Sequence, residues 1–180
     1  MANRKKKIFA ISGSTRTNSS NEAILKLIAT LYSEAMEVCI FNEIDGLPHY
    51  NPDLDTEEVP TNVKNFRKQI EAAEGVIICT PEYVFSLPGS LKNAIEWTVS
   101  TTIFLDKPTA LIVASSMGEK AFESLTLIMK TVGAKMTEST RLLIKGARSK
   151  LNEKGGFSDE QTAKEIERLV ISLTEVIDNR

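Results

Sequence analysis

The stretch Lys7-Ile-Phe-Ala-Ile-Ser12, with the polar segment Gly13-Ser-Thr-Arg-Thr-Asn-Ser-Ser-Asn21 directly behind it, decides the fold. Its first half is a short unbroken apolar run, which is typical of a strand buried on both faces of a parallel sheet. After the polar segment, apolar residues recur at helical spacing from Ile24 to Leu31. A strand, a polar loop and a helix in this order form the first unit of an α/β fold.

The same alternation continues along the chain, because residues with helical periodicity follow each further apolar run. The expected strands are Met36–Phe41, Gly75–Thr80, Pro108–Ala114 and a weaker fifth one near Ala134–Glu138 or Leu142–Ile144. Parallel strands joined by helices require crossovers of one hand, so we predict an α/β doubly wound, five-stranded parallel sheet with helices on both faces. In the strand order 2-1-3-4-5, the first and third strands are neighbours.

Length and charge limit the classes of function. The chain has 180 residues, and its 22 basic and 24 acidic side chains give a formal net charge of −2. This length fits one domain, residues 1–180, and the charge argues against a nucleic-acid partner held by bulk charge. No apolar run reaches the roughly 18–20 residues of a membrane helix, and the basic opening residues lack the apolar stretch of a signal peptide. We therefore expect a cytoplasmic protein with no membrane or nucleic-acid partner.

The cysteines and the single histidine bear on metal binding and redox compartment. Cys39 and Cys79 lie within apolar runs, so we expect two buried, reduced thiols rather than a disulfide. Two separated cysteines and His49 are too few and too scattered to make a metal site. We expect no metal.

The polar segment Gly13–Asn21 combines hydroxyl and amide side chains with Arg16 and contains no carboxylate. Such a loop at the start of a helix suits an anion, because hydroxyls, free N–H groups and a guanidinium can surround a phosphate. It lacks the Gly-Lys-Ser/Thr end of a Walker loop and the three spaced glycines of a dinucleotide-binding loop. The alternative is purely structural: Ser19 caps the helix and Glu22 completes a capping box.

A second candidate loop, Thr80-Pro-Glu-Tyr-Val-Phe-Ser-Leu-Pro-Gly89, follows the third strand. In open parallel sheets ligands bind beyond the carboxyl ends of the strands, so this loop and the first one should border one crevice. Tyr83 and Phe85 could present a surface to a flat ligand there. Composition alone favours the alternative, in which both rings pack on the next helix, and Trp97 is expected in the core or at an interface.

Together these motifs resemble the NADPH-dependent FMN reductase family, which includes quinone, chromate and azo-dye reductases with a flavodoxin-like fold. The likeness rests on Gly13-Ser-Thr-Arg16 with Ser19 and Asn21, and on Thr80-Pro-Glu-Tyr83 with the later Leu91-Lys-Asn-Ala-Ile-Glu-Trp97. It spans most of the chain, and each motif follows the matching strand. The resemblance implies FMN as the cofactor and NADPH or NADH as the co-substrate.

The resemblance also implies which residues hold the flavin. The phosphate contacts would fall on Ser14, Arg16, Ser19 and Asn21. The isoalloxazine contacts would fall on Pro81, Glu82, Tyr83, Val84 and Phe85, mostly through backbone atoms. Two places depart from the family's pattern: many members have Asn where this chain has Val84, and the loop Ser115–Glu119 lacks the paired glycines that members often show.

No residue is assigned as an acid–base catalyst, because in such proteins the flavin performs the redox chemistry. Glu82 is a candidate for polarising the flavin or positioning the nicotinamide, and the alternative is a solvated loop carboxylate. Tyr83 is a candidate for lining the substrate side.

The function that the resemblance implies is an FMN-dependent oxidoreductase, which moves a hydride from NAD(P)H through the flavin to a small acceptor such as a quinone, free flavin, azo dye or metal oxyanion. One flavin face in one crevice indicates a ping-pong mechanism. Family members commonly build part of the pocket across subunits, which implies a homodimer or homotetramer. A flavodoxin-type electron carrier and a non-catalytic flavin-binding regulator are the alternatives, although a charge of −2 is weak for a carrier steered by charge.

Overall fold

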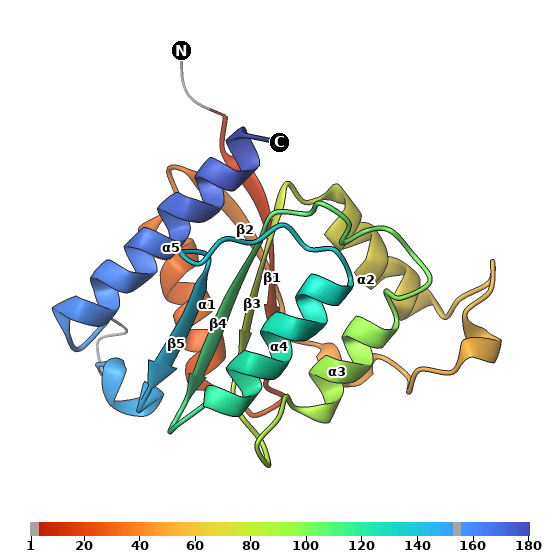
Figure 1. The fold of residues 1–180 in the computed structure, drawn as a ribbon, viewed down its shortest axis with the longest axis horizontal. Coiled ribbons are helices and arrows are strands. Elements are labelled where there is room, and N and C mark those ends of the chain that lie inside the picture. Colours follow the sequence, from red (N-terminus) through yellow and green to blue (C-terminus); the bar gives the residue numbers. More distant parts are fainter. Residues whose placement is uncertain (1–3, 153–155) are drawn as a thin grey trace.

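A computed structural model describes residues 4–152 and 156–180 and contains one parallel sheet (Figure 1). The strands pair in the order β2-β1-β3-β4-β5, with all four pairings parallel. Their bounds are β1 (Lys6–Ser12), β2 (Met36–Phe41), β3 (Gly75–Thr80), β4 (Thr109–Ser115) and β5 (Arg141–Lys145). The predicted fold class and strand order are therefore confirmed.

Helices cover both faces of the sheet (Figure 1). One face carries α1 (Ser20–Leu31) and α5 (Glu160–Asp178), and the other carries α2 (Thr61–Ala72), α3 (Gly89–Glu96) and α4 (Glu119–Thr131). Because all the strands are parallel, every loop that follows a strand lies at the same edge of the sheet, where the carboxyl ends of the strands are.

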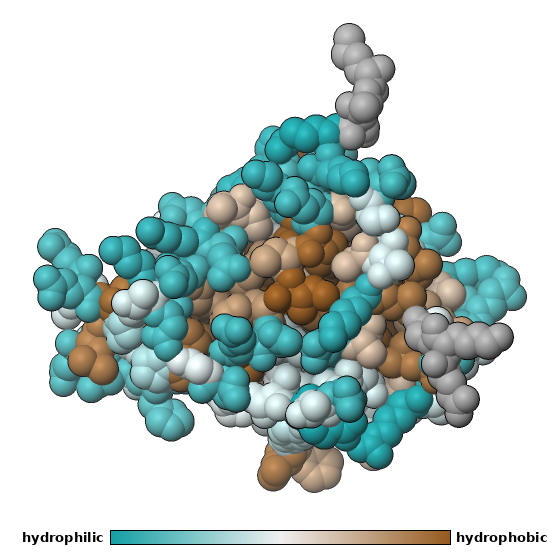
Figure 2. All heavy atoms as spheres, turned by 180° about the vertical axis from the view of Figure 1, so that it is seen from behind, coloured by the Kyte–Doolittle hydropathy of each residue, from teal (hydrophilic) through white to brown (hydrophobic). Residues whose placement is uncertain are grey.

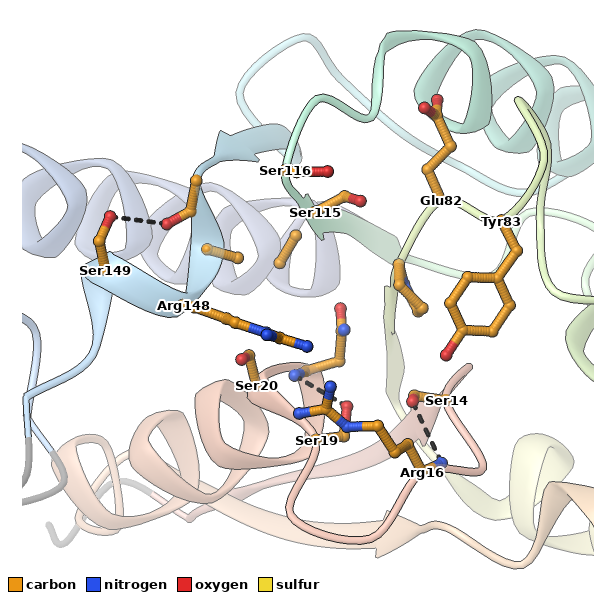
Figure 3. A pocket seen from close by; sticks show the side chains of 15 residues that line it. Ser14, Arg16, Ser19, Ser20, Glu82, Tyr83, Ser115, Ser116, Arg148 and Ser149 are labelled. Atoms are coloured by element: carbon orange, nitrogen blue, oxygen red, sulfur yellow. Dashed lines mark hydrogen bonds between the residues drawn. The ribbon is translucent and has the colours of Figure 1, made fainter.

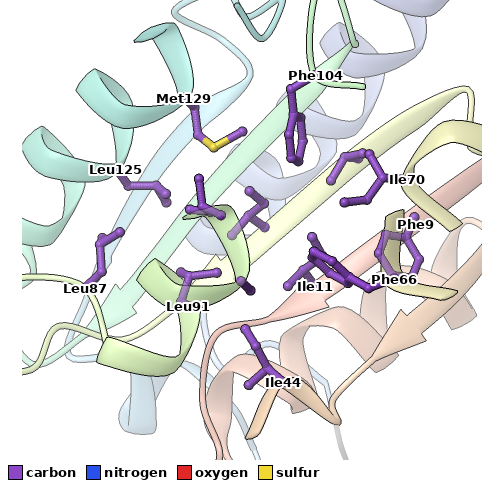
Figure 4. Packing of buried hydrophobic residues seen from close by; sticks show 14 of the residues in the cluster. Phe9, Ile11, Ile44, Phe66, Ile70, Leu87, Leu91, Phe104, Leu125 and Met129 are labelled. Atoms are coloured by element: carbon purple, nitrogen blue, oxygen red, sulfur yellow. The ribbon is translucent and has the colours of Figure 1, made fainter. Parts of the chain in front are cut away.

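Successive residues of a central strand serve opposite layers. In β1, Ile8 and Ala10 belong to the apolar cluster under α1 and α5, while Phe9 and Ile11 belong to the cluster under α2, α3 and α4 (Figure 4). All six residues of β3 are buried. Burial on both faces is the reason why these strands appear in the sequence as unbroken apolar runs rather than as alternating ones.

The two edge strands differ from this pattern, and two sequence expectations fail there. The fifth strand is Arg141–Lys145, which includes the second predicted place, Leu142–Ile144. In the first predicted place, Ala134–Glu138, Lys135 makes only an isolated bridge to Pro108. Cys39 in β2 is exposed rather than buried, whereas Cys79 in the central β3 is fully buried. An edge strand has a neighbour on one side only, so its apolar run does not guarantee burial of each residue.

The long connection between β2 and α2 contains two short 3-10 helices, Ile44–Gly46 and Pro52–Leu54. Side chains of α3 and its end hold it in place. Asn93 accepts a hydrogen bond from the Tyr50 N–H at 2.7 Å, and the indole N–H of the buried Trp97 donates to the Pro48 carbonyl at 2.7 Å. Trp97 is therefore a core residue, which was one of the two places predicted for it, the other being an interface.

Candidate functional site

The loops after four strands enclose one cavity of about 610 Å³ at the carboxyl edge of the sheet (Figure 3). Seven of the nine sequence-predicted site residues line it, namely Ser14, Arg16, Ser19, Asn21, Pro81, Glu82 and Tyr83. The other two, Val84 and Phe85, lie outside the cavity lining. A cavity of this size is within the range of small-molecule and cofactor sites, about 300–1,000 Å³.

The first loop arranges donors around the start of α1. Ser19 is the N-cap of the helix, and its Oγ accepts a hydrogen bond from the Asn21 N–H at 3.2 Å. The Ser14 Oγ accepts one from the Arg16 N–H at 3.3 Å, and the Arg16 guanidinium donates to the Asn18 carbonyl at 3.3 Å. Ser19 thus caps the helix, as the structural alternative proposed. The other N–H groups of the first turn lie at the end of α1 that borders the cavity.

Glu22 does not complete the predicted capping box within the described hydrogen bonds. Its carboxylate forms an ion pair with Lys26 at 2.7 Å and accepts a hydrogen bond from Asn42 at 3.2 Å. The hydrogen bond to Lys26 is the main cause that lowers the pKa of Glu22 below its ordinary value, and burial opposes it. Glu22 is therefore turned toward the end of β2, away from the helix N-terminus.

Asn21 is held by a residue of β3. The thiol of Cys79 donates to its Oδ1 at 3.4 Å, and burial raises the pKa of this thiol so that it stays protonated and remains a donor. With Oδ1 used in this way, the Asn21 amide presents its Nδ2 group, which donates no hydrogen bond to another described residue. A buried thiol therefore fixes which end of the Asn21 amide is available to a ligand.

Gly13 is required by close packing between the two loops. A Cβ at this position would lie 2.4 Å from the Oγ1 of Thr80 and 2.9 Å from a methyl carbon of Leu91. Its backbone is not among those with positive φ. The absence of a side chain at Gly13 is thus what allows the first loop to approach the end of β3.

Glu82 links the second loop to α4. Its Oε2 accepts hydrogen bonds from the backbone N–H groups of Lys120 and Ala121, both at 2.9 Å. The helix begins after Gly118, which has φ of 98° and no side chain to cap it. Glu82 is therefore not the solvated carboxylate of the alternative interpretation: it caps α4 from a distant loop and ties that loop to the helix.

The tip of the second loop is a tight hairpin. Tyr83 and Ser86 pair through two backbone hydrogen bonds, at 2.9 and 3.0 Å, and the two residues between them have positive φ, 50° for Val84 and 57° for Phe85. Val84 is 96% exposed, Phe85 74% and Tyr83 45%. The expectation that both rings pack on the next helix is wrong, because Phe85 stands mostly in solvent and Tyr83 lines the cavity. Figure 2 shows apolar atoms protruding at the lower edge of the molecule.

Sequence reasoning missed one wall of the cavity. Lining residues from the end of β4 and from the turn after β5 were not predicted, namely Ala114, Ser115, Ser116, Gly146, Ala147, Arg148 and Ser149. Ser20 at the start of α1 is also added. The turn after β5 could have been found from the rule that ligands bind at strand ends, but only if the end of that strand had been located at Lys145.

The described ranges, 4–152 and 156–180, hold neither a metal cluster nor a membrane-spanning helix. They contain no group of three or more His, Cys, Asp and Glu side chains placed to hold a metal ion. They also contain no helix that is long and apolar enough to cross a membrane.

Comparison with known proteins decides the family. Residues 6–148 match the family described as NADPH-dependent FMN reductase. The chain belongs to this family. An NAD(P)H-dependent FMN reductase from Pseudomonas aeruginosa is 39% identical over 112 residues, 61% of this chain and 60% of the relative. A quinone reductase from Escherichia coli is 38% identical over 119 residues, 63% of this chain and 62% of the relative. Each match thus spans about three fifths of the relative's own length.

One solved structure is similar to this chain over nearly its whole length. A flavoenzyme NAD(P)H:(acceptor) oxidoreductase from Paracoccus denitrificans has a TM-score of 0.83 and 30% identity, covering 97% of this chain and 98% of that one. The family identified from the two loops is thereby confirmed. FMN is the cofactor of the family, and the cavity fits it, because hydroxyls, a free Asn21 amide and Arg16 gather at a helix start for a phosphate. The individual contact residues stay a prediction.

Proposed function

We propose that this member of the NADPH-dependent FMN reductase family is an NAD(P)H-dependent oxidoreductase that reduces a small acceptor, such as a quinone, free flavin, azo dye or metal oxyanion. The observation that carries the proposal is that the loop after β1, Gly13–Asn21, and the loop after β3, Thr80–Gly89, border the same cavity. The relatives named as FMN and quinone reductases support the same class of reaction.

In this proposal the chain binds and orients, and bound FMN would supply the redox chemistry by taking up a hydride and passing on electrons. Ser14, Arg16, Ser19 and Asn21 would hold the phosphate. The backbone from Pro81 to Phe85 would border the ring, with Tyr83 on the substrate side. Glu82 positions this border indirectly, since its carboxylate is already engaged by the start of α4.

We expect NADPH or NADH and the acceptor to bind in turn, because one cavity must serve both. Initial rates measured against both substrates should give parallel double-reciprocal lines. Intersecting lines, with a ternary complex trapped in the site, would contradict this order.

The exposed hairpin supports a homodimer or homotetramer. Val84 and Phe85 present apolar surface beside the cavity, which favours contact with a second subunit. Leu87 and Trp97 are buried within the chain and do not add to this surface. Light scattering at micromolar concentration should give at least twice the mass of one chain, and a single-chain mass would remove the proposal.

The two free cysteines among the described residues are compatible with the cytoplasm as the compartment of this protein.

Flavin binding and turnover test the proposal together. FMN at about 100 times its dissociation constant should add about 2.7 kcal/mol to the free energy of unfolding. The FMN-loaded protein should then oxidise NADPH steadily in the presence of a quinone. Absence of FMN binding would contradict the site, whereas binding without turnover would favour an electron carrier or a flavin-binding regulator.

A further inference from the structure

Arg148 belongs to the cavity wall that the sequence did not predict. It lies in the 3-10 helix Ala147–Lys150, which follows β5 and begins after Gly146, a residue with φ of 64°. Arg148 lines the same cavity as Arg16, Ser19 and Ser20. Figure 3 shows its side chain extending from this turn across the cavity toward the start of α1, on the side opposite Arg16.

The other cations of this segment have carboxylate partners, and Arg148 does not. Lys145 forms an ion pair with Glu119 at 2.5 Å, and Lys150 forms one with Asp159 at 3.1 Å. Within residues 4–152 and 156–180, Arg148 makes neither an ion pair nor a side-chain hydrogen bond. Its guanidinium is therefore available to an anion in the cavity.

The charges in the cavity are unbalanced at this end. Arg16 and Arg148 both direct guanidinium groups to the start of α1, which itself carries partial positive charge. Glu82 is the only carboxylate in the cavity lining, and its Oε2 is bound by the start of α4. Like charges that converge without a counter-charge indicate a site for an anionic ligand.

A phosphate monoester matches this arrangement in charge and geometry. At pH 7 it carries close to two negative charges, because its second pKa is about 6, and it offers three acceptor oxygens. Two guanidinium groups supply two positive charges and paired N–H donors. A neutral ligand, or one with a single negative charge, would leave part of the positive charge unpaired.

We propose that Arg148 is a second phosphate-binding residue, which closes on the FMN phosphate from the side of β5 while Arg16 and the first loop hold it from the side of β1. The inference rests on the proposed function, since it takes the cavity to be the FMN site. It adds a residue from the turn after the last strand, outside both loops that carry the family resemblance. The competing source of phosphate is NADPH, whose phosphates would have to reach the same end of the cavity.

The test compares FMN with riboflavin, which lacks the phosphate. Dissociation constants of both flavins would be measured for the flavin-free full chain as wild type, Arg148→Ala, Arg148→Lys and Lys150→Ala. We expect Arg148→Ala to weaken FMN by about tenfold or more and to leave riboflavin unchanged. Arg148→Lys, which keeps the charge without the planar fork, should lose less. Lys150→Ala removes a charge two residues away that does not line the cavity, so the ratio of the two constants should be that of the wild type.

Two results would overturn the role of Arg148. One is an unchanged ratio of FMN to riboflavin affinity in Arg148→Ala, including an equal loss for both flavins. The other is an unchanged FMN affinity with a raised KM for NADPH in the FMN-saturated variant, which would assign the residue to the co-substrate. Wild-type protein that binds neither flavin would instead contradict the proposed function itself. Arg148 is exposed and makes no hydrogen bond through its side chain among the described residues, so its removal should not impair folding.

Discussion

The first loop and the hairpin after β3 border the same cavity but are built in opposite ways. The first loop satisfies itself locally: Ser19 caps α1, Ser14 accepts from a neighbouring N–H, and its one residue with positive φ is Asn18, a type that tolerates this conformation. The hairpin places Val84 and Phe85 in the same left-handed region and exposes both. The comparison indicates that local hydrogen bonds hold the first loop in its conformation. The hairpin has a strained backbone, and its apolar side chains are free to make a further contact.

The largest expected effect is on the first loop. If the Arg16 guanidinium binds the FMN phosphate, Arg16→Ala should cost about 1.5–3 kcal/mol of FMN binding, roughly ten- to a hundredfold in affinity. Riboflavin binding should hardly change, because it has no phosphate. Fluorescence titration of both flavins checks this, and an unchanged FMN dissociation constant would remove Arg16 from the site.

The contact between the two walls is tested by Gly13→Ala. The added Cβ would meet Thr80 Oγ1 at 2.4 Å, so we expect a loss of about 1–3 kcal/mol in the free energy of unfolding and weaker binding of FMN and riboflavin alike. Urea denaturation and the same titrations measure both. Gly89→Ala is the matched control, since no atom lies within 4 Å of its added Cβ; equal destabilisation by both changes would argue against the packing explanation.

The strain in the hairpin is tested by Val84→Asn, which installs at φ of 50° the residue type that the first loop uses at Asn18. Asn tolerates this region better than a β-branched residue, so we expect a gain of about 1 kcal/mol in the free energy of unfolding. Thermal denaturation measures it. Val99→Asn is the control, because Val99 is also exposed but has no positive φ. A similar gain there would mean that exchanging an exposed apolar side chain for a polar one, and not relief of strain, stabilises the protein.

The smallest effect concerns the link from the hairpin to α4. Glu82→Gln keeps an acceptor oxygen but removes the negative charge at the helix start, so we expect a loss of about 0.3–1 kcal/mol that shrinks at high salt. Denaturation at two ionic strengths measures it. Glu123→Gln serves as the control because this carboxylate is exposed and pairs with Lys120 on the same helix. A loss as large for Glu123→Gln would contradict the capping role of Glu82.

Several site features could be found from the sequence because they depend on local chemistry. An unbroken apolar run followed by a polar segment places Ser14, Arg16, Ser19 and Asn21 at a strand end and a helix start, whatever packs around them. The same reasoning located Pro81, Glu82 and Tyr83 at the end of β3. These seven residues line the cavity, as the topology of a parallel sheet requires of its strand ends.

Other features failed because they depend on neighbours that are distant in the sequence. Cys39 is exposed because β2 is an edge strand, and Arg148 was missed because β5, the other edge strand, is short and only partly buried. Glu82 could not be assigned to the start of α4, since the two are 38 and 39 residues apart at the points of contact.

The sequence by itself determined the layered α/β fold, the order of its elements and the loop that suits a phosphate, because hydrophobic periodicity and helix capping act over a few residues. Only the tertiary structure decided that Gly13 must lack a side chain, that Cys79 orients Asn21, that Val84 and Phe85 stand in solvent and that Arg148 faces Arg16 across the cavity. Each of these depends on which strands lie side by side, and that follows from packing of the whole sheet.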